Sequence, residues 1–201
     1  MNNTLVLLAG YPGTGKSYLC NIIMSKYKEF YLLSPDNIKE YYWDKYGFND
    51  LKEKEELIQK SWVKYYELME VHMKNKECII SDYPFSEKQK DKIDSLSKKY
   101  NYRIITIRMI ADIDVLFERQ KQRDLLDDRH LGHILSKYQK GVTINDRINA
   151  DGILSYEEFS NRCKYRGYDK FELGSTYELD VTDYTKINYD EFINNILGDS
   201  E

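Results

Sequence analysis

Eight residues near the start of the chain have the types and spacing of a phosphate-binding loop. They read Gly10-Tyr11-Pro12-Gly13-Thr14-Gly15-Lys16-Ser17, which fits the P-loop pattern G-x-x-x-x-G-K-S/T. The glycines let successive backbone N–H groups turn toward one anion, and the positive end of a following helix adds to the attraction. In such a loop the lysine reaches the β- and γ-phosphates, and the serine hydroxyl is a ligand of Mg²⁺. The motif therefore predicts a site for ATP or GTP with Mg²⁺, and ATP is favoured because no Asn-Lys-x-Asp motif for guanine is present.

Two aspartates follow predicted strands, where they could act on the same phosphates. Asp36 comes just after the short second strand and is either a base for an attacking hydroxyl or a helix-capping residue. Lys39, three residues later, would share its helix face and could hold an anion of the substrate. Asp82 ends the apolar run at 78–81, which is the place of an aspartate that holds Mg²⁺ beside Ser17; the alternative is a turn aspartate before Pro84.

Three arginines follow the fourth predicted strand. Arg119 and Arg123 are four residues apart, so both guanidinium groups would lie on one helix face, and Arg129 follows in a polar segment. Arginines that a mobile element brings over the γ-phosphate stabilise the charge of the transition state. The alternative is a solvated helix face that pairs with Glu118 and Asp124.

Two further patterns have the spacing of metal ligands. Residues 149–159 resemble most of an EF-hand loop, but the first ligand position falls on Arg147, so we expect a capped turn into a helix. His130 and His133 are three residues apart without a third good ligand nearby, and we expect them on the surface of a lid.

The composition is that of a soluble globular protein. Of the 201 residues, 41% are hydrophobic and 32% charged, and the net charge is −4. This acidic balance argues against a general nucleic-acid binder, although a local basic groove is compatible with it. Three widely spaced cysteines (Cys20, Cys78 and Cys163) favour the reducing cytoplasm, and no apolar run approaches the ~18 residues of a membrane span.

Predicted strands alternate with predicted helices along the chain. Strands are expected at 4–9, 30–33, 78–81, 102–109 and 176–181, and the intervening helices at 15–28, 38–46, 51–75, 86–100, 111–123, 156–165 and 190–197. This order predicts a three-layer α/β/α fold with a five-stranded, mainly parallel sheet in a single domain, 1–201. The polar stretch at about 124–150 is expected to form a helical lid or substrate excursion. Ligands of such sheets bind beyond the carboxyl ends of the strands, to which the P-loop, Asp36 and Asp82 map.

The chain resembles a known group of enzymes. The P-loop, Pro35-Asp36-Asn37-Ile38-Lys39, Ile79-Ile80-Ser81-Asp82 and Arg119 with Arg123 are similar to small P-loop kinases of the polynucleotide-kinase, zeta-toxin and chloramphenicol-phosphotransferase type. The resemblance spans most of residues 4–129 and includes a late strand, Leu179-Asp180-Val181-Thr182.

This resemblance implies a P-loop NTPase fold and a set of roles. Asp36 would be the general base, Lys16 and Ser17 would bind ATP–Mg²⁺, and Asp82 would lie near the metal or the acceptor. Arg119 and Arg123 would be lid arginines, one beside the adenine and one on phosphate. Polynucleotide kinases of this group have an arginine where this chain has Lys39, and lysine cannot make the same forked contact.

The main hypothesis is a kinase that transfers the γ-phosphoryl group of ATP to a small-molecule or nucleotide-type acceptor. Lys16, Asp36, Arg119 and Arg123 would be catalytic, and Asp36, Lys39, Asp82 and Arg129 would contact the acceptor. One alternative is an ATPase or nucleotide-dependent switch that binds a partner protein through a surface such as Tyr41-Tyr42-Trp43. Others are a polynucleotide 5′-hydroxyl kinase, or a zeta-type toxin with an antitoxin-like partner.

Overall fold

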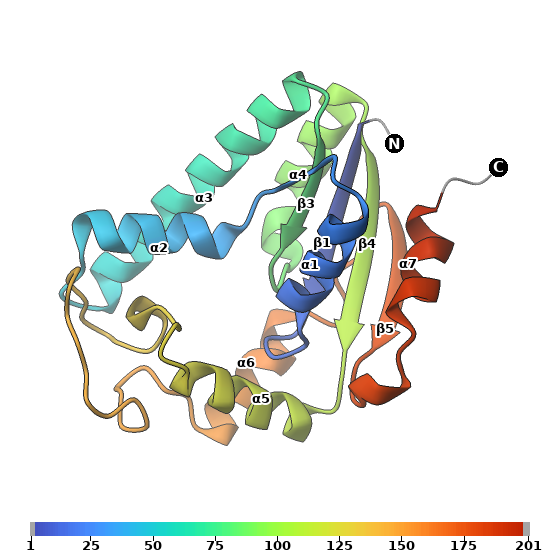
Figure 1. The fold of residues 1–201 in the computed structure, drawn as a ribbon. Helices are drawn as coiled ribbons and strands as arrows, with labels where there is room; N and C mark the ends of the chain where they lie inside the picture. The colour runs from blue at the N-terminus through green and yellow to red at the C-terminus, as the bar shows by residue number, and fades with distance from the viewer. Residues whose placement is uncertain (1–2, 199–201) are drawn as a thin grey trace.

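A sheet of five parallel strands forms the centre of the molecule, in the order β2-β3-β1-β4-β5 (Figure 1). The structure, a computed structural model, describes residues 3–198. The strands are β1 (Thr4–Gly10), β2 (Phe30–Leu32), β3 (Cys78–Asp82), β4 (Arg103–Ile110) and β5 (Ser175–Asp180). Each lies within one residue of its predicted bounds, so the predicted α/β sheet is confirmed.

Helices cover both faces of this sheet. Helices α1 (Lys16–Lys26) and α7 (Tyr189–Leu197) pack on the face that carries Val6 and Leu8. Helices α3 (Leu51–Lys74) and α4 (Glu87–Tyr100) pack on the opposite face, which carries Leu5 and Leu7. Successive side chains of a strand point to opposite faces, so a central strand buried on both sides is apolar throughout. Strand β1 is buried along its whole length, and the three-layer arrangement is confirmed.

The remaining helices lie beyond the carboxyl ends of the strands (Figure 1). They are α2 (Pro35–Tyr46), α5 (Ile113–Leu125) and α6 (Tyr156–Arg166), with short 3-10 turns at Leu131–His133 and Tyr184–Lys186. Helix α2 begins three residues earlier than predicted, because Pro35 stands at its first position with Ser34 as the N-cap. Proline is favourable there, since that position needs no hydrogen-bonded N–H. Asp36 therefore lies in the first turn of a helix and not in a turn before it.

The segment predicted as a lid packs against α2 and α3. An antiparallel bridge joins Phe48 to Tyr138, and these two rings share a small core with Trp43 and Leu57. Trp43 is buried, so the suggestion that it belongs to a surface for a partner protein is wrong. In the described part of the chain, no helix combines the length and apolar character needed to cross a membrane.

Candidate functional site

The P-loop joins β1 to α1 in a conformation that requires glycine at three positions. The φ angles of Gly10, Gly13 and Gly15 are +110°, +84° and +79°, which side chains rarely adopt. A Cβ atom on Gly10 would lie 1.9 Å from the carbonyl oxygen of Met109, and one on Gly13 would lie 2.8 Å from that of Leu116. The second contact shows that α5 passes directly beside the loop.

The amine of Lys16 is enclosed by this loop. Its Nζ donates to the carbonyl oxygens of Gly10 (3.2 Å) and Tyr11 (2.5 Å) and to the Thr14 hydroxyl (3.2 Å). The residue is 8% exposed, and burial lowers the pKa of Lys16 to about 7. This amine is in a water-poor position, where its charge would act strongly on an anion.

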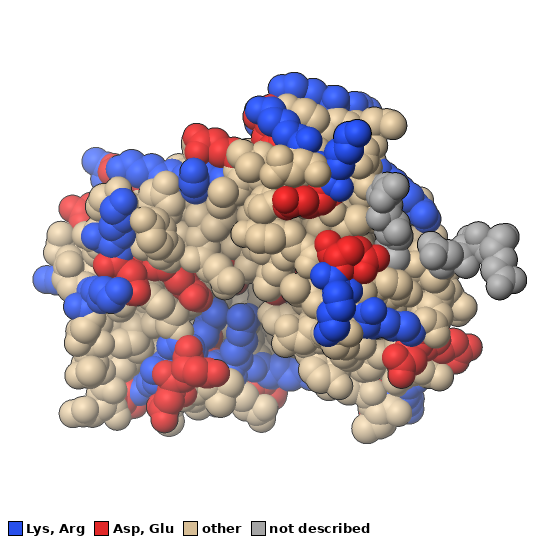
Figure 2. All heavy atoms as spheres, turned by 45° about the horizontal axis from the view of Figure 1, so that its top comes forward, with Lys and Arg blue, Asp and Glu red and all other residues tan. Residues whose placement is uncertain are grey.

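Three of the predicted site residues act electrostatically on this amine. The charges of Asp82 and Asp36 favour protonation of Lys16, and the charge of Arg123 opposes it. The structure therefore brings together residues from the ends of β1 and β3, the start of α2 and the far part of α5. Figure 2 shows a hollow in the middle of the molecule, with lysine and arginine side chains inside it.

Ser17 and Asp82 form the second part of the site. The Ser17 hydroxyl donates to Asp82 Oδ2 over 2.7 Å, while Asp82 Oδ1 is buried and has no hydrogen-bond partner. Burial raises the pKa of Asp82; the negative charge of Asp36 adds to this, while the hydroxyls of Ser17 and Ser34 oppose it. A buried carboxylate oxygen without a partner is costly unless a cation satisfies it.

These two side chains fit a magnesium ion. No group of three or more His, Cys, Asp or Glu side chains converges on a metal position within residues 3–198. Mg²⁺ does not need such a group, because it is commonly held by one or two protein oxygens, the substrate phosphates and water. The pair Ser17 and Asp82 supplies that number of protein ligands.

Asp36 and Lys39 form a buried ion pair in the first turns of α2. Their charged atoms are 3.1 Å apart, and the Lys39 side chain is only 7% exposed. The Lys39 amine also lies 4.0 Å from the centre of the Tyr83 ring, a favourable cation–π contact. Its charge is thus already compensated in this structure, by Asp36 and an aromatic face.

The carboxyl group of Asp36 is held in its ionised form. Burial tends to raise the pKa of Asp36, but the charges of Lys39, His133 and Arg129 outweigh burial and hold that pKa well below its ordinary value. The structure places Arg129 beside this carboxylate and also in an ion pair with Asp124 at 3.3 Å. An ionised carboxylate, paired with Lys39, thus lies within electrostatic range of Lys16 of the phosphate-binding loop.

The two arginines of α5 have different surroundings. Arg119 donates to the carbonyl oxygens of Val181 (2.7 Å) and Thr182 (2.9 Å), and its guanidinium lies 3.8 Å from the centre of the Tyr184 ring. Arg123, one turn later, is exposed, and no hydrogen bond or ion pair of its side chain is found among residues 3–198. Of the two, Arg123 alone acts electrostatically on Lys16.

We expected the two histidines on the surface of the lid, but the structure places both rings against Trp43 of α2. His133 bonds Glu40 over 2.7 Å, His130 bonds Asp44 over 3.1 Å, and both rings contact Trp43 of α2. Both histidines contact the buried tryptophan, and no local sequence pattern connects Trp43 with residues some 90 positions later in the chain.

The segment with EF-hand character is a capped helix start, as expected. The Ser155 hydroxyl and the Glu158 carboxylate bond each other's backbone N–H groups and form a capping box at α6. Arg147 donates to the carbonyl oxygens of Arg129 (3.1 Å) and Asp127 (2.9 Å). These two hydrogen bonds connect the loop before α6 to residues 127–129 of the predicted lid segment.

Two cations near the site were not singled out from the sequence. Lys54 lies at the start of α3, and Arg162 lies on α6 within electrostatic range of it. Arg162 is also within range of Tyr83 and Tyr168. Neither residue belongs to a motif, and the two side chains come within electrostatic range only in the folded chain, so a single sequence carries no signal for the pair.

A family model described as AAA domain (AAA_33) matches residues 5–139, from β1 into the lid. The chain belongs to this AAA domain family. The matched region contains the P-loop, both aspartates and the three arginines described above. The resemblance to P-loop kinases is thus confirmed at the level of family and fold.

Solved structures with the same fold extend over nearly the whole chain. A protein of Chloroflexus aurantiacus j-10-fl that is provisionally classed as a kinase has 20% identity and a TM-score of 0.73, covering 98% of this chain and 95% of its own. A sugar kinase from Janibacter sp. HTCC2649 has 11% identity and a TM-score of 0.56, covering 98% and 96%. A gluconokinase from Sinorhizobium meliloti 1021 has 12% identity and a TM-score of 0.51, covering 97% and 89%. At these identities the likeness establishes the P-loop kinase fold and not the substrate.

Proposed function

We propose that this protein is an ATP-dependent phosphotransferase that moves the γ-phosphoryl group of ATP to a hydroxyl group of a small-molecule or nucleotide-type acceptor. The observation that supports this best is that the charges of Asp82, Arg123 and Asp36 all act on the Lys16 amine, while Asp82 also accepts a hydrogen bond from Ser17 of the same loop. A protein that only holds a nucleotide needs the loop and the metal ligands. A second carboxylate, kept ionised opposite the phosphate loop, is what a transferase needs in addition.

On the nucleotide side, the backbone of residues 10–17 and the Lys16 amine would bind the phosphates of ATP. Ser17 and Asp82 would hold Mg²⁺, which when bound neutralises negative charge on the β- and γ-phosphate oxygens. We assign Arg119 to the adenine side, since it lies against Tyr184 and the end of β5. We assign Arg123 to the phosphates, since its guanidinium is unpaired and near Lys16.

On the acceptor side, Asp36 would accept a hydrogen bond from the attacking hydroxyl. The hydroxyl oxygen forms a bond to the γ-phosphorus, the bond from that phosphorus to the bridging oxygen of ADP breaks, and the hydroxyl proton passes to Asp36. The low pKa of Asp36 is compatible with this role, because phosphoryl transfer depends mainly on positioning and the proton becomes acidic late in the step. Lys39 would position Asp36, and Arg129 would stabilise its charged form.

The acceptor class is supported by the fold comparison alone. Two proteins of the same fold are named as a sugar kinase and a gluconokinase, which makes a polyhydroxylated small molecule a suitable first choice. We infer that residues 1–201 form a single domain and act in the cytoplasm, where the buried cysteines Cys20, Cys78 and Cys163 would stay reduced.

The test is phosphoryl transfer from ATP labelled in the γ-position. Purified protein is incubated with labelled ATP–Mg²⁺ and a panel of sugars, sugar acids, sugar phosphates, nucleosides, nucleotides and oligonucleotide 5′ ends. We expect label on at least one small acceptor. Release of free phosphate with no labelled acceptor would favour the ATPase or switch, and label on oligonucleotide ends alone would favour the polynucleotide kinase.

A further inference from the structure

Helix α2 carries three carboxylates at successive turns. Asp36, Glu40 and Asp44 are each four residues apart, and side chains at that spacing lie on one face of a helix. Asp36, the proposed base, pairs with Lys39 of its own helix over 3.1 Å. The other two carboxylates bond side chains of the predicted lid segment. The helix that carries the base is thus also the helix on which this segment docks.

Two histidines of the lid segment make these contacts. His133 Nε2 lies 2.7 Å from a carboxylate oxygen of Glu40. His130 Nε2 lies 3.1 Å from a carboxylate oxygen of Asp44. The Nδ1 atom of His130 accepts a hydrogen bond from the backbone N–H of Gly132 over 2.9 Å, so the proton of this ring is on Nε2, which donates to Asp44. Both of its nitrogen atoms are therefore used, one within the turn and one toward α2.

The indole ring of Trp43 fits into the turn that carries the two histidines. Its centre lies 4.9 Å from that of the His133 ring and 5.7 Å from that of the His130 ring. A Cβ atom on Gly132 would lie 2.4 Å from this indole, so only glycine lets the turn approach the helix so closely. The lid segment thus docks on α2 through a shaped contact as well as through two hydrogen bonds.

The docked turn follows directly after Arg129, to which we assigned the stabilisation of the charged base. The Nε atom of Arg129 lies 3.3 Å from Asp124 Oδ1 at the end of α5, and the Arg129 side chain is 11% exposed. Its carbonyl oxygen accepts a hydrogen bond from Arg147 over 3.1 Å. The guanidinium is therefore held to α5 by its own ion pair, and to α2, the helix of Asp36, through the docking of His130.

A different part of the chain contacts the nucleotide loop. A Cβ atom on Gly13 would lie 2.8 Å from the carbonyl oxygen of Leu116, early in α5. The two histidines follow the end of that helix, at Leu125, and contact α2. A change in the histidines should therefore affect the acceptor side of the site and not the binding of ATP.

We propose that His130 and His133 are positioning residues of the acceptor site, which hold the lid segment and Arg129 against the helix that carries Asp36. This assignment rests on the phosphotransferase activity proposed above. A hydrogen bond to a carboxylate is stronger than one between neutral groups, and side chains fixed by packing hold a geometry better than free ones. The two rings act through Arg129 and α2, and they do not contact the transferred group.

Hydrogen exchange of backbone amides tests the docking without any activity. The N–H groups of residues 133–135 donate to the carbonyl oxygens of residues 130 and 131, so they report whether the turn is formed. His130→Leu and His133→Leu should each speed this exchange by about tenfold, the value of one charge-assisted hydrogen bond. Amides of β1 serve as the reference for global unfolding. The matched control is His72→Leu, because His72 also bonds a carboxylate, Glu77, but lies on α3.

Kinetic constants test the effect on the acceptor. His130→Leu and His133→Leu should each lower kcat/KM for the acceptor by about tenfold, with KM for ATP within about twofold of the wild type. His133→Gln should recover most of the loss, because its amide N–H can take the place of Nε2 and donate to Glu40. The shorter side chain of His133→Asn should not. Equal losses for ATP and acceptor, without recovery by glutamine, would show a merely structural role and overturn the proposal.

The two measurements separate this proposal from the kinase activity. Exchange at residues 133–135 that is the same in the wild type and in both leucine variants would reject the docking contact, whatever the kinase assay shows. Absent labelling of every acceptor would reject the kinase, and with it the role in acceptor binding, while faster exchange in the variants would leave the docking itself established. Faster exchange together with a loss confined to the acceptor supports the proposal.

Discussion

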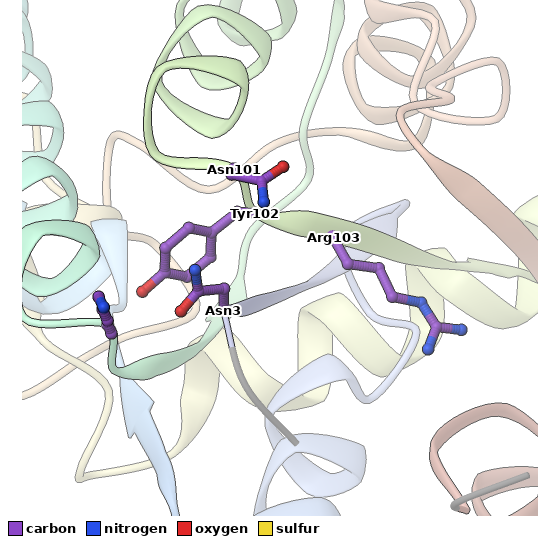
Figure 3. Close-up of a pocket in the computed structure, with 5 residues that line it drawn as sticks. Asn3, Asn101, Tyr102 and Arg103 are labelled. Atoms are coloured by element: carbon purple, nitrogen blue, oxygen red, sulfur yellow. The ribbon is translucent and has the colours of Figure 1, made fainter.

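The two edges of the central sheet differ in what the chain places beyond them. At the carboxyl edge, β1 leads into the P-loop, β2 into Asp36 and β3 into Asp82, and helices α1 and α2 begin there. At the amino edge, β1 and β4 begin, and helices α3 and α4 end. A hollow of about 650 Å³ lies at this second edge, lined by Asn3, Lys76, Asn101, Tyr102 and Arg103 (Figure 3).

The hollow at the amino edge is large, but the side chains that line it do not point to one place. The Tyr102 hydroxyl is occupied by the carbonyl oxygen of Glu77 at 2.7 Å, and Asn101 is the left-handed cap of α4. Figure 3 shows the Arg103 side chain directed away from Asn3 and Tyr102. Helix C-termini present carbonyl groups, which repel the phosphates that helix N-termini attract. The comparison teaches that a site is indicated by side chains and dipoles that point to one place, and that a cavity alone does not indicate one.

The largest effect is expected from Lys16→Met at the carboxyl edge. The change keeps the buried stem of the side chain and removes the charge nearest the transferred group, so phosphoryl transfer should fall by about 10³-fold. Steady-state transfer and equilibrium ATP binding measure it, with the exposed Lys28→Met as the control. Retention of near-normal transfer would mean that the carboxyl edge is not where the chemistry occurs.

Asp36→Asn should have the next largest effect. Transfer should fall by at least about 10²-fold while ATP binding stays nearly intact, because the amide cannot accept the hydroxyl proton. Loss of the ion pair also leaves Lys39 buried with its charge uncompensated, so the fold is checked by urea unfolding. The control is Asp91→Asn, an exposed change on α4. Transfer that does not change would remove Asp36 as the base.

At the carboxyl edge, the sequence predicts well those features whose residues lie close together along the chain. The P-loop contains its own glycines, lysine and serine in eight residues, and its flanking strand and helix are readable from apolar periodicity. The strands β1 to β4 are readable mainly as short apolar runs, whereas β5, with the sequence STYELD, is largely polar and is predicted from its place in the strand–helix alternation. Asp82 was found because it directly follows such a run.

The parts that the sequence did not predict depend on contacts between distant segments. His133 acts electrostatically on Asp36, and its ring contacts Trp43 of α2, but no local pattern connects position 133 with α2. Lys39 is predicted to share a helix face with Asp36. Its burial against Tyr83 could be predicted only if the position of α2 at the end of β3 were known. Arg162 of α6 and Lys54 of α3 come within electrostatic range of each other only in the folded chain. These contacts are tertiary, and periodicity carries no information on them.

A pH effect should also be confined to the carboxyl edge. The pKa of Lys16 is lowered to about 7 in the free protein, while the unfolded chain keeps the ordinary value near 10.5. Between these two pH values the unfolded chain binds one more proton at Lys16 than the folded protein does. The contribution of Lys16 to the free energy of unfolding of the nucleotide-free protein therefore rises as pH rises above about 7. Bound phosphate favours the charged amine, so ATP binding should take up close to one proton near pH 8.5.

Calorimetry in buffers of different ionisation enthalpy measures this uptake. ATP affinity should fall by up to about tenfold per pH unit above pH 7, and Lys16→Met should show no such slope. An unchanged number of protons in wild type and variant would place the titrating group elsewhere.

The smallest effect is expected at the amino edge. Arg103→Ala removes an exposed guanidinium that has no side-chain hydrogen bond among the described residues. Arg123→Ala removes a guanidinium of the same kind at the carboxyl edge. Arg103→Ala should leave kcat/KM within about twofold and the free energy of unfolding within about 0.5 kcal/mol. Arg123→Ala should lower kcat by about tenfold or more, because its charge lies beside Lys16 and the transferred group. The two variants lose the same group at the same exposure, so equal effects on transfer would contradict the assignment of function to one edge.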